Sequence, residues 1–331
     1  MMNLIKKVKA FYFKICNNFL FILENNSSPI FVYDLYSFKL IKKIGENYEG
    51  SLYSMKKFIV DESFKGIEVD TFFEKKIFDE NENIFYYIVD NEYGIVRKFV
   101  GKFEVDFYLL EIEKSQLLQK IDFEGEIVLF FDSGDIISNT DNTLFRYTNF
   151  SLLWQKDFSE ITNYKDYDGS LKQGEIREIY SYNNTLIVLT QLFILRINLQ
   201  TGEIIYSLQL PAGLMTLSIE GDKAYGCYGY HYMEIDLEKG ELINFVRIEN
   251  ALLNGQEYNA IMNKACYKDG FVFHGLRLEG GQYAVGAINT KTGKREWISP
   301  LSVSMVEKIE FHNDKMFILD TGGNLYIYEK N

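Results

Sequence analysis

The sequence predicts an all-β protein made of repeated four-stranded antiparallel sheets. Aromatic residues make up 16% of the chain, with 27 Phe and 24 Tyr, and Gly, Asn and Asp separate its short apolar segments. Such segments are typical of strands, because aromatic side chains fit a pleated surface. A hairpin pattern and a short polar turn also recur along the chain. Since 47% of residues are apolar and only three are proline, we expect residues 1–331 to form a single domain with a large core.

The clearest element is a β-hairpin at residues 194–210, ILRINLQTGEIIYSLQL. Apolar and polar residues alternate from Leu195 to Leu199 and again from Ile204 to Leu208, which is the two-residue period of a strand. Between the strands, Gly202 is free to adopt the positive φ that a type I turn closed by a bulge requires. Asn198 is suited to accept hydrogen bonds from the backbone that follows it.

The turn of this hairpin recurs along the sequence. Asn or Asp stands four residues before Gly in three copies, at Asn198–Gly202, Asp236–Gly240 and Asn289–Gly293. Weaker copies lie within residues 33–39, 110–116 and 145–151. A second marker, a short polar turn between two apolar strands, lies at 17–18, 82–83, 133–134, 183–184, 221–222, 269–270 and 313–314.

These markers predict a unit of four antiparallel strands, which is the signature of a β-propeller blade. We predict seven blades, at residues 8–46, 72–122, 126–158, 175–210, 214–248, 258–301 and 305–328. The last lacks a fourth strand, and Asn3–Val8 resembles the outer strand Lys39–Ile44. We therefore expect the N-terminal strand to complete the last blade and close the ring, which removes an open sheet edge. Eight blades are the alternative, because residues 67–78 are also suited to form a hairpin.

The turns resemble those of PQQ-like (quinoprotein-type) propellers, which carry D-x-x-T-G-K-x-x-W, and the repeat resembles WD40-like repeats more broadly. The resemblance rests on Asn289, Thr292-Gly293-Lys294 and Trp297, and on Asn198, Thr201-Gly202-Glu203 and Tyr206 beside them. It implies a propeller whose Trp and Tyr side chains pack between blades. It implies no particular activity.

Charge and cysteine usage limit the function classes. The net charge is −12, whereas nucleic-acid binders rely on a basic surface, so we expect no nucleic-acid partner. An acidic protein attracts basic partners, although solubility explains the same charge. Cys16, Cys227 and Cys266 lie far apart and predict inert thiols in a reducing compartment.

We expect a cytoplasmic protein that does not enter a membrane. The apolar N-terminal segment is interrupted by Lys14, Asn17 and Asn18 and has no small-residue cleavage site after it. No apolar stretch of 18 residues occurs elsewhere in the chain.

The sequence contains no recognisable catalytic or metal-binding motif. Its three histidines, His231, His274 and His312, have no ligand partner two or four residues on. No phosphate-binding loop, nucleophile elbow or zinc-hydrolase motif occurs. The segment 166–169 resembles the start of a calcium loop, but the terminal Glu is misplaced. We therefore predict no catalytic residues, no metal and no cofactor.

Blade geometry places the first and third turns of each blade on one rim, and the connections within and between blades on the other. The longest expected connections all fall on that second rim, at 47–71, 90–105, 159–174, 249–257 and 275–284. Long loops in a compact domain commonly carry function, and neutral drift is the other explanation. Aromatics mixed with acids, Gly and Asn are typical of protein-binding surfaces. The predicted contact residues are Tyr164, Asp166, Tyr167, Asp168, Tyr228, Tyr230, His231, Glu257 and Tyr258.

The acidic segment 61–92 is a second candidate for contact with a basic partner, and a solvated face explains it equally well. We therefore predict a non-catalytic, protein-binding propeller. A narrower hypothesis is a cytoplasmic immunity protein that neutralises a basic toxin by covering its active surface. The alternatives are an enzyme or small-ligand-binding propeller with a site at the mouth of the central channel, and a scaffold subunit of a larger complex.

Overall fold

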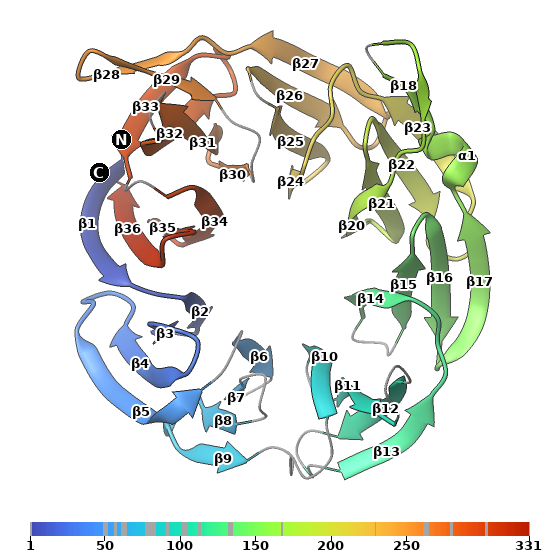
Figure 1. Cartoon of the computed structure of the whole chain (residues 1–331), viewed down its shortest axis with the longest axis vertical. Helices are drawn as coiled ribbons and strands as arrows, with labels where there is room; N and C mark the ends of the chain where they lie inside the picture. The colour runs from blue at the N-terminus through green and yellow to red at the C-terminus, as the bar shows by residue number, and fades with distance from the viewer. Residues whose placement is uncertain are drawn as a thin grey trace. The chain divides into compact units, whose positions relative to one another are not determined.

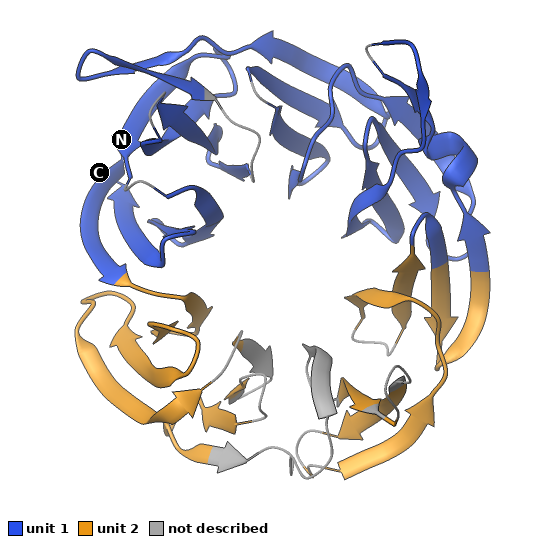
Figure 2. Ribbon diagram, in the orientation of Figure 1, with its two compact units in different colours: residues 1–8, 141–144, 155–331 blue, residues 9–140, 145–154 orange. Residues whose placement is uncertain are grey.

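The computed structural model describes residues 2–48, 52–55, 58–60, 65–76, 84–90, 93–100, 105–111, 114, 116–131, 135–166, 168–228, 230–260, 265–278, 281–301 and 304–330. Within these residues the chain forms 36 β-strands and one single-turn α-helix (Figure 1). The chain divides into two compact units (Figure 2). Unit 1 comprises residues 1–8, 141–144 and 155–331, and unit 2 comprises residues 9–140 and 145–154.

Four sheets lie wholly or mainly in unit 2, and each is formed by four consecutive strands. The first contains β2 (Tyr12–Cys16), β3 (Phe19–Leu23), β4 (Ser28–Asp34) and β5 (Leu40–Tyr48). The second contains β6 (Tyr53–Met55), β7 (Phe58–Val60), β8 (Lys65–Glu68) and β9 (Glu74–Lys76). The third contains β10 (Ile84–Asp90), β11 (Tyr93–Phe99), β12 (Val105–Glu111) and β13 (Gln116–Ile121). The fourth contains β14 (Glu126–Phe130), β15 (Ile136–Thr140), β16 (Thr143–Thr148) and β17 (Ser151–Asp157).

Unit 1 holds four further large sheets, three of four strands and one that two additional strands, described below, extend to six. They contain β20 (Ile176–Tyr182), β21 (Thr185–Thr190), β22 (Phe193–Asn198) and β23 (Ile204–Gln209); then β24 (Ser218–Glu220), β25 (Lys223–Tyr228), β26 (His231–Asp236) and β27 (Glu241–Arg247). Next come β30 (Cys266–Lys268), β31 (Phe271–Leu278), β32 (Tyr283–Asn289) and β33 (Arg295–Pro300). The last sheet contains β34 (Val306–His312), β35 (Lys315–Asp320), β36 (Asn324–Lys330) and β1 (Met2–Lys9).

The all-β class and the repeated four-stranded antiparallel sheet are confirmed, and the number of sheets matches the alternative of eight. The sequence predicts one blade at residues 72–122, whereas the strands within this range belong to two sheets, and β6–β9 form the additional one. Residues 67–76 do form the hairpin on which that alternative depends, since β8 pairs with β9, and residues 77–78 lie outside the described residues.

Neighbouring sheets share their cores. In unit 1 the second and third strands of each sheet are largely buried, as in β21 and β35, whereas the fourth strands alternate between exposed and half-buried residues, as in β23. One apolar cluster joins Leu189 and Ile194 of one sheet to Met233 and Ile235 of the next. The repeat is therefore stabilised by burial of apolar faces between successive sheets.

The hairpin turns form as the sequence predicts. The Asn198 side chain accepts hydrogen bonds from the N–H groups of Gln200 (2.8 Å) and Thr201 (3.1 Å), and the Gly202 N–H donates to the Asn198 carbonyl. Gly202, Gly240 and Gly293 have φ of 70°, 69° and 67°, which a residue with a Cβ adopts only with strain.

The N-terminal strand completes the last sheet, as predicted. β1 lies beside β36 in the sheet order, and the two chain ends lie side by side (Figure 1). The Trp297 indole N–H donates to the Met2 carbonyl (3.0 Å), and the Lys7 ammonium lies 4.8 Å from the Tyr326 ring centre. Residues nearly the whole chain apart in sequence thus stabilise one another within unit 1.

Two of the five expected long connections are wrong, and a third is shorter than expected. Residues 47–71 contain β6, β7 and β8, residues 90–105 contain β11, and the connection expected at 275–284 is shortened by β31 and β32. These strands were missed because they are short or broken by Gly, Lys and acidic residues, which weakens the alternation that predicts a strand. The connection at 159–174 is confirmed, and the one expected at 249–257 is present but longer, since β29 runs to Ala260 and β30 begins at Cys266.

Candidate interaction surface

The first long connection of unit 1 runs from β17 to β20 and is held at its base by Asn142. The Asn142 amide donates to the Gly174 carbonyl (2.8 Å) and accepts from the Ile176 N–H (3.0 Å), and its side chain is buried. Helix α1 (Ser159–Thr162) starts this connection. Asp157 accepts hydrogen bonds from the N–H and hydroxyl of Ser159. These hydrogen bonds therefore fix both ends of the connection.

From that base a short hairpin projects, formed by β18 (Tyr164–Lys165) and β19 (Leu171–Lys172). The Asp166 N–H donates to the Ser170 carbonyl (2.9 Å). The Asp168 carboxylate accepts from Ser170, and this hydrogen bonding lowers the pKa of Asp168. Three of the predicted contact residues, Tyr164, Asp166 and Asp168, thus lie on one hairpin, and Tyr167 lies outside the described residues.

The turn between β25 and β26 carries the second predicted group. Tyr230 is 40% exposed, and its carbonyl accepts from the Ile248 N–H. The His231 ring stacks on Phe245, with 4.5 Å between ring centres. Tyr228 is half-buried and packs against the core cluster of its sheet. Of these three residues only Tyr230 is exposed, and Tyr228 and His231 are half-buried.

The second long connection carries a hairpin of its own, formed by β28 (Ala251–Leu253) and β29 (Gln256–Ala260). β29 also pairs with the end of β31, where Tyr258 faces Leu278, so the hairpin extends that sheet. Glu257 is exposed and accepts from the Asn250 side chain. Tyr258 corrects the prediction, because it is only 3% exposed and packs in a core cluster. An alternating strand places Glu257 outward and Tyr258 inward.

Each hairpin displays an apolar residue that sequence reasoning missed. Leu171 is 70% exposed and Leu252 is 74% exposed. Both leucines follow the fourth strand of a sheet and precede the first strand of the next, and in antiparallel four-stranded sheets such connections leave the same rim. The sheets of β20–β27 lie between the two hairpins in unit 1 (Figure 1). The sequence does contain a signal for these two residues, because each is a Leu within an otherwise polar connection. A search for aromatic and acidic residues does not detect it.

The same two connections are acidic. Residues 158–175 contain four acids (Glu160, Asp166, Asp168, Glu175) and two lysines, a formal charge of −2, and residues 248–260 contain Glu249 and Glu257 with no basic residue, also −2. By contrast, two of the described acids of segment 61–92 form local hydrogen bonds. Glu68 accepts from Thr71 (2.7 Å) and Glu74 from the Tyr48 hydroxyl (3.2 Å).

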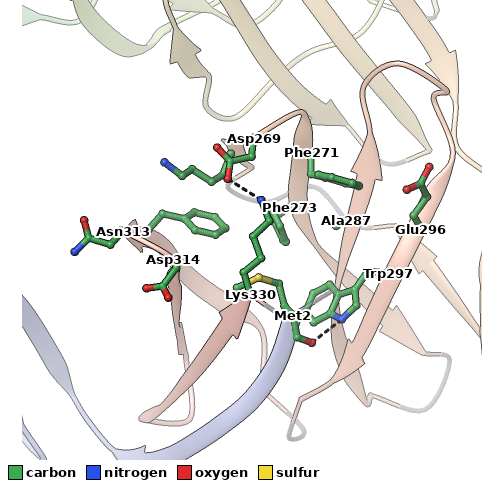
Figure 3. A pocket seen from close by; sticks show the side chains of 12 residues that line it. Met2, Asp269, Phe271, Phe273, Ala287, Glu296, Trp297, Asn313, Asp314 and Lys330 are labelled. Atoms are coloured by element: carbon green, nitrogen blue, oxygen red, sulfur yellow. Dashed lines mark hydrogen bonds and ion pairs between the residues drawn. The ribbon is translucent and has the colours of Figure 1, made fainter. Parts of the chain in front are cut away.

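The opposite rim of unit 1 contains a cavity of about 180 Å³ between the sheet of β30–β33 and the last sheet (Figure 3). Aromatic and apolar side chains form its floor: Phe271, Phe273, Phe311, Trp297, Ala287 and Met2. Phe273 lies 4.9 Å from Phe311 and 6.0 Å from Trp297, measured between ring centres. Charged residues ring the mouth: Asp269, Asp314, Glu296, Lys268 and Lys330.

The histidines and cysteines occupy structural positions. His274 is completely buried, and desolvation lowers its pKa to about 3. Burial raises the pKa of the Cys227 thiol to about 12 and that of Cys266 to about 11, and all three cysteines are free. Across the described part of the chain, no group of three or more His, Cys, Asp or Glu side chains is arranged to hold a metal, and no helix is long and apolar enough to cross a membrane.

Comparison with protein-family models gives no match, and neither does comparison with curated protein sequences. Solved structures do match. The crystal structure of BamB from Moraxella catarrhalis has a TM-score of 0.64 at 9% identity and covers 100% of both chains. Saccharomyces cerevisiae Sqt1 has a TM-score of 0.63 at 11% identity, and the computationally designed Ika8 protein 0.62 at 13%; each covers 97% of this chain and 96% of its own.

The chain has the β-propeller fold. BamB and Sqt1 are WD40-like propellers, and the PQQ-like resemblance of the turns is consistent with BamB. At these identities the likeness establishes the fold alone, since propellers host many unrelated functions.

Proposed function

We propose that this chain is a non-catalytic propeller that binds another protein through the two hairpins on one rim of unit 1, β18–β19 and β28–β29. The observation that carries the proposal is the pair of exposed leucines, Leu171 and Leu252, each at least 70% exposed and each held out on a short hairpin. Exposed apolar surface rimmed by polar residues is a feature of protein-interaction sites, where a few anchor residues contribute most of the binding energy. Tyr164, Tyr230, Asp166, Asp168 and Glu257 supply the surrounding polar contacts.

The partner's contact surface is basic. The two connections carry a combined formal charge of −4, the whole chain −12, and complementary charge speeds association and suppresses wrong partners. The narrower form of the proposal is a cytoplasmic immunity protein whose partner is a basic toxin.

The test uses three purified variants and one candidate partner, the product of the neighbouring gene. Leu171→Asp and Leu252→Asp should each weaken binding at least tenfold in calorimetry, because a hot-spot residue contributes a large share of the affinity. Phe73→Asp is the matched control. Phe73 is 73% exposed, but it lies in the turn between the third and fourth strands of one sheet and not in a connection between two sheets. Equal loss in all three variants would contradict this surface.

The toxin hypothesis has a separate readout. Co-expression of the wild-type chain should restore growth of cells that produce the neighbouring gene product, and Leu171→Asp should not. If the neighbouring product binds through Leu171 without harming cells, protein binding stands and the immunity role is wrong.

A further inference from the structure

The cavity between the last two sheets lies on the rim opposite the proposed protein-binding hairpins. We propose that it binds a small organic cation, whose aromatic body enters between Phe271, Phe273 and Trp297 while its ammonium lies beside Glu296. This site is independent of the proposed function, because none of its lining residues belongs to either hairpin.

The volume of the cavity limits the size of the aromatic part of the ligand. This volume is about 180 Å³, and an apolar protein cavity of roughly 150 Å³ accepts benzene. The space therefore admits one six-membered ring with a short substituent. A fused three-ring compound or a peptide segment exceeds it.

The floor provides apolar contact and no free polar group of its own. Trp297 is the only floor side chain with a strong donor, and its indole N–H already donates to the Met2 carbonyl (Figure 3). An edge-to-face contact of 5.5 Å with Tyr328 fixes the Trp297 ring. A ring entering the floor thus gains apolar and aromatic contact without breaking a hydrogen bond.

The mouth selects a positive charge. The Asp269 carboxylate is paired with the Lys330 ammonium (3.1 Å), and Asp314 shares Lys315 with Glu329. Glu296 forms no ion pair with a described residue; it accepts only from the neutral side chains of Asn289 (2.9 Å) and Thr292 (3.5 Å). Glu296 and Asp314 flank the aromatic floor (Figure 3), while Lys268 is the remaining ammonium of the lining.

Two effects favour an ammonium at this mouth. It gains an ion pair with Glu296, and the ring faces below attract cations through their quadrupoles. A carboxylate at the same place meets Glu296 and Asp314, which repel it. An aromatic amine is thus the ligand class that matches both the floor and the mouth.

The chain provides its own probe for this site, because Trp154 and Trp297 are its only tryptophans. Trp154→Phe leaves Trp297 as the sole tryptophan, so its fluorescence reports the cavity. We would titrate this variant with 2-phenylethylammonium, neutral 2-phenylethanol and anionic 3-phenylpropionate. We expect a saturable change for the cation, binding about threefold to tenfold weaker for the alcohol, and weaker still for the acid.

Two substitutions separate charge from shape. Glu296→Gln should reduce the preference for the cation over the alcohol to less than twofold, whereas Glu203→Gln, an exposed carboxylate at the matching turn of another sheet, should leave it unchanged. Ala287→Val, which narrows the floor, should weaken cation and alcohol alike.

The charge comparison decides the proposal even if Ala287→Val fails to fold. No saturable fluorescence change with the cation up to about 10 mM, equal binding of the acid, or an unchanged cation preference in Glu296→Gln would each overturn it. Leu171→Asp should not affect these titrations, so failure of the cavity site and failure of the protein-binding surface give different results.

Discussion

At the scale of single residues, the Asn142 amide fixes the connection that carries the first hairpin. Its side chain binds both the Gly174 carbonyl and the Ile176 N–H. Asn142→Ala leaves these two groups unsatisfied at a buried position, so we expect a loss of about 2–3 kcal/mol in the free energy of unfolding. Urea denaturation measures it. Asn250→Ala, an exposed Asn on the other connection, is the control and should cost less than about 0.5 kcal/mol.

A second residue-scale prediction concerns Glu238, which links two sheets of unit 1. Its carboxylate binds Arg196 (2.9 Å), the Tyr182 hydroxyl (2.9 Å) and the Asn183 amide (3.2 Å), and these contacts lower the Glu238 pKa to about 2. A carboxyl whose pKa is lower in the folded state adds stability above its unfolded pKa of about 4.5, and this stability is lost as the pH falls towards 2.

The wild-type chain should therefore lose melting temperature between about pH 5 and pH 2 more steeply than Glu238→Gln. Above pH 5 the variant should be the less stable of the two, because it lacks the ion pair. Melting curves at half-unit pH steps test this, with Glu203→Gln as a matched loss of one exposed carboxylate. Parallel curves for wild type and Glu238→Gln would show that Glu238 contributes no pH-dependent stability.

At the scale of the elements, the turn chemistry explains which sheets were predictable. Asn198, Asp236 and Asn289 precede their turns with an acceptor, and a Gly follows at the positive φ. The β8–β9 turn forms the same backbone bonds, from the Phe72 N–H to the Glu68 carbonyl and from the Glu68 N–H to the Phe73 carbonyl. There Phe72 takes the positive φ of 53°. Because this turn contains no Gly, the sequence pattern does not distinguish its sheet from the next one.

The glycine of these turns also allows close contact with the preceding sheet. A Cβ on Gly240 would lie 2.7–2.9 Å from the Tyr206 ring of the preceding sheet, whereas a Cβ on Gly221 meets nothing within 4 Å. Both have positive φ, 69° and 56°. Gly221→Ala should cost about 1–2 kcal/mol from backbone strain, and Gly240→Ala a further 1–3 kcal/mol from the clash.

A double-mutant cycle isolates the clash. In a Tyr206→Ala background, Gly240→Ala should cost no more than Gly221→Ala, because the ring that the Cβ meets is gone. Chemical denaturation of the four proteins gives the coupling free energy. A coupling of zero would mean that sheet-to-sheet contact does not explain the Gly at this turn.

At the scale of the whole molecule, the fold was predictable and the sites were not, for a physical reason. The fold repeats, so a local pattern recurs often enough to be recognised in one sequence. The cavity is assembled once, from Met2, Phe271, Trp297, Phe311 and Lys330, which are distant in sequence. Each of these residues alone is typical of a core or a solvated surface. Similarly, burial separates Tyr258 from Glu257, although the two are adjacent in the chain.

The N-terminal strand protects the edge of the sheet at the chain ends. β1 covers the edge of β36, and Met2 also accepts the Trp297 hydrogen bond. Removing residues 1–9 exposes the backbone groups of β36, a template for pairing with another chain. We expect the truncated chain to melt at least about 5 °C lower and to associate in a concentration-dependent way on size-exclusion chromatography.

A permuted chain distinguishes loss of the strand from loss of its position in the sequence. Because the two ends lie side by side within unit 1 (Figure 1), residues 2–9 can follow residue 331 through a short Gly-Asn turn, with the new chain starting at Ala10. The fourth strand is then joined to β36 directly, as β23 is joined to β22 by its turn. This permutant should be monomeric and should regain most of the lost melting temperature. If it associates as the truncated chain does, pairing of β1 with β36 does not protect this edge.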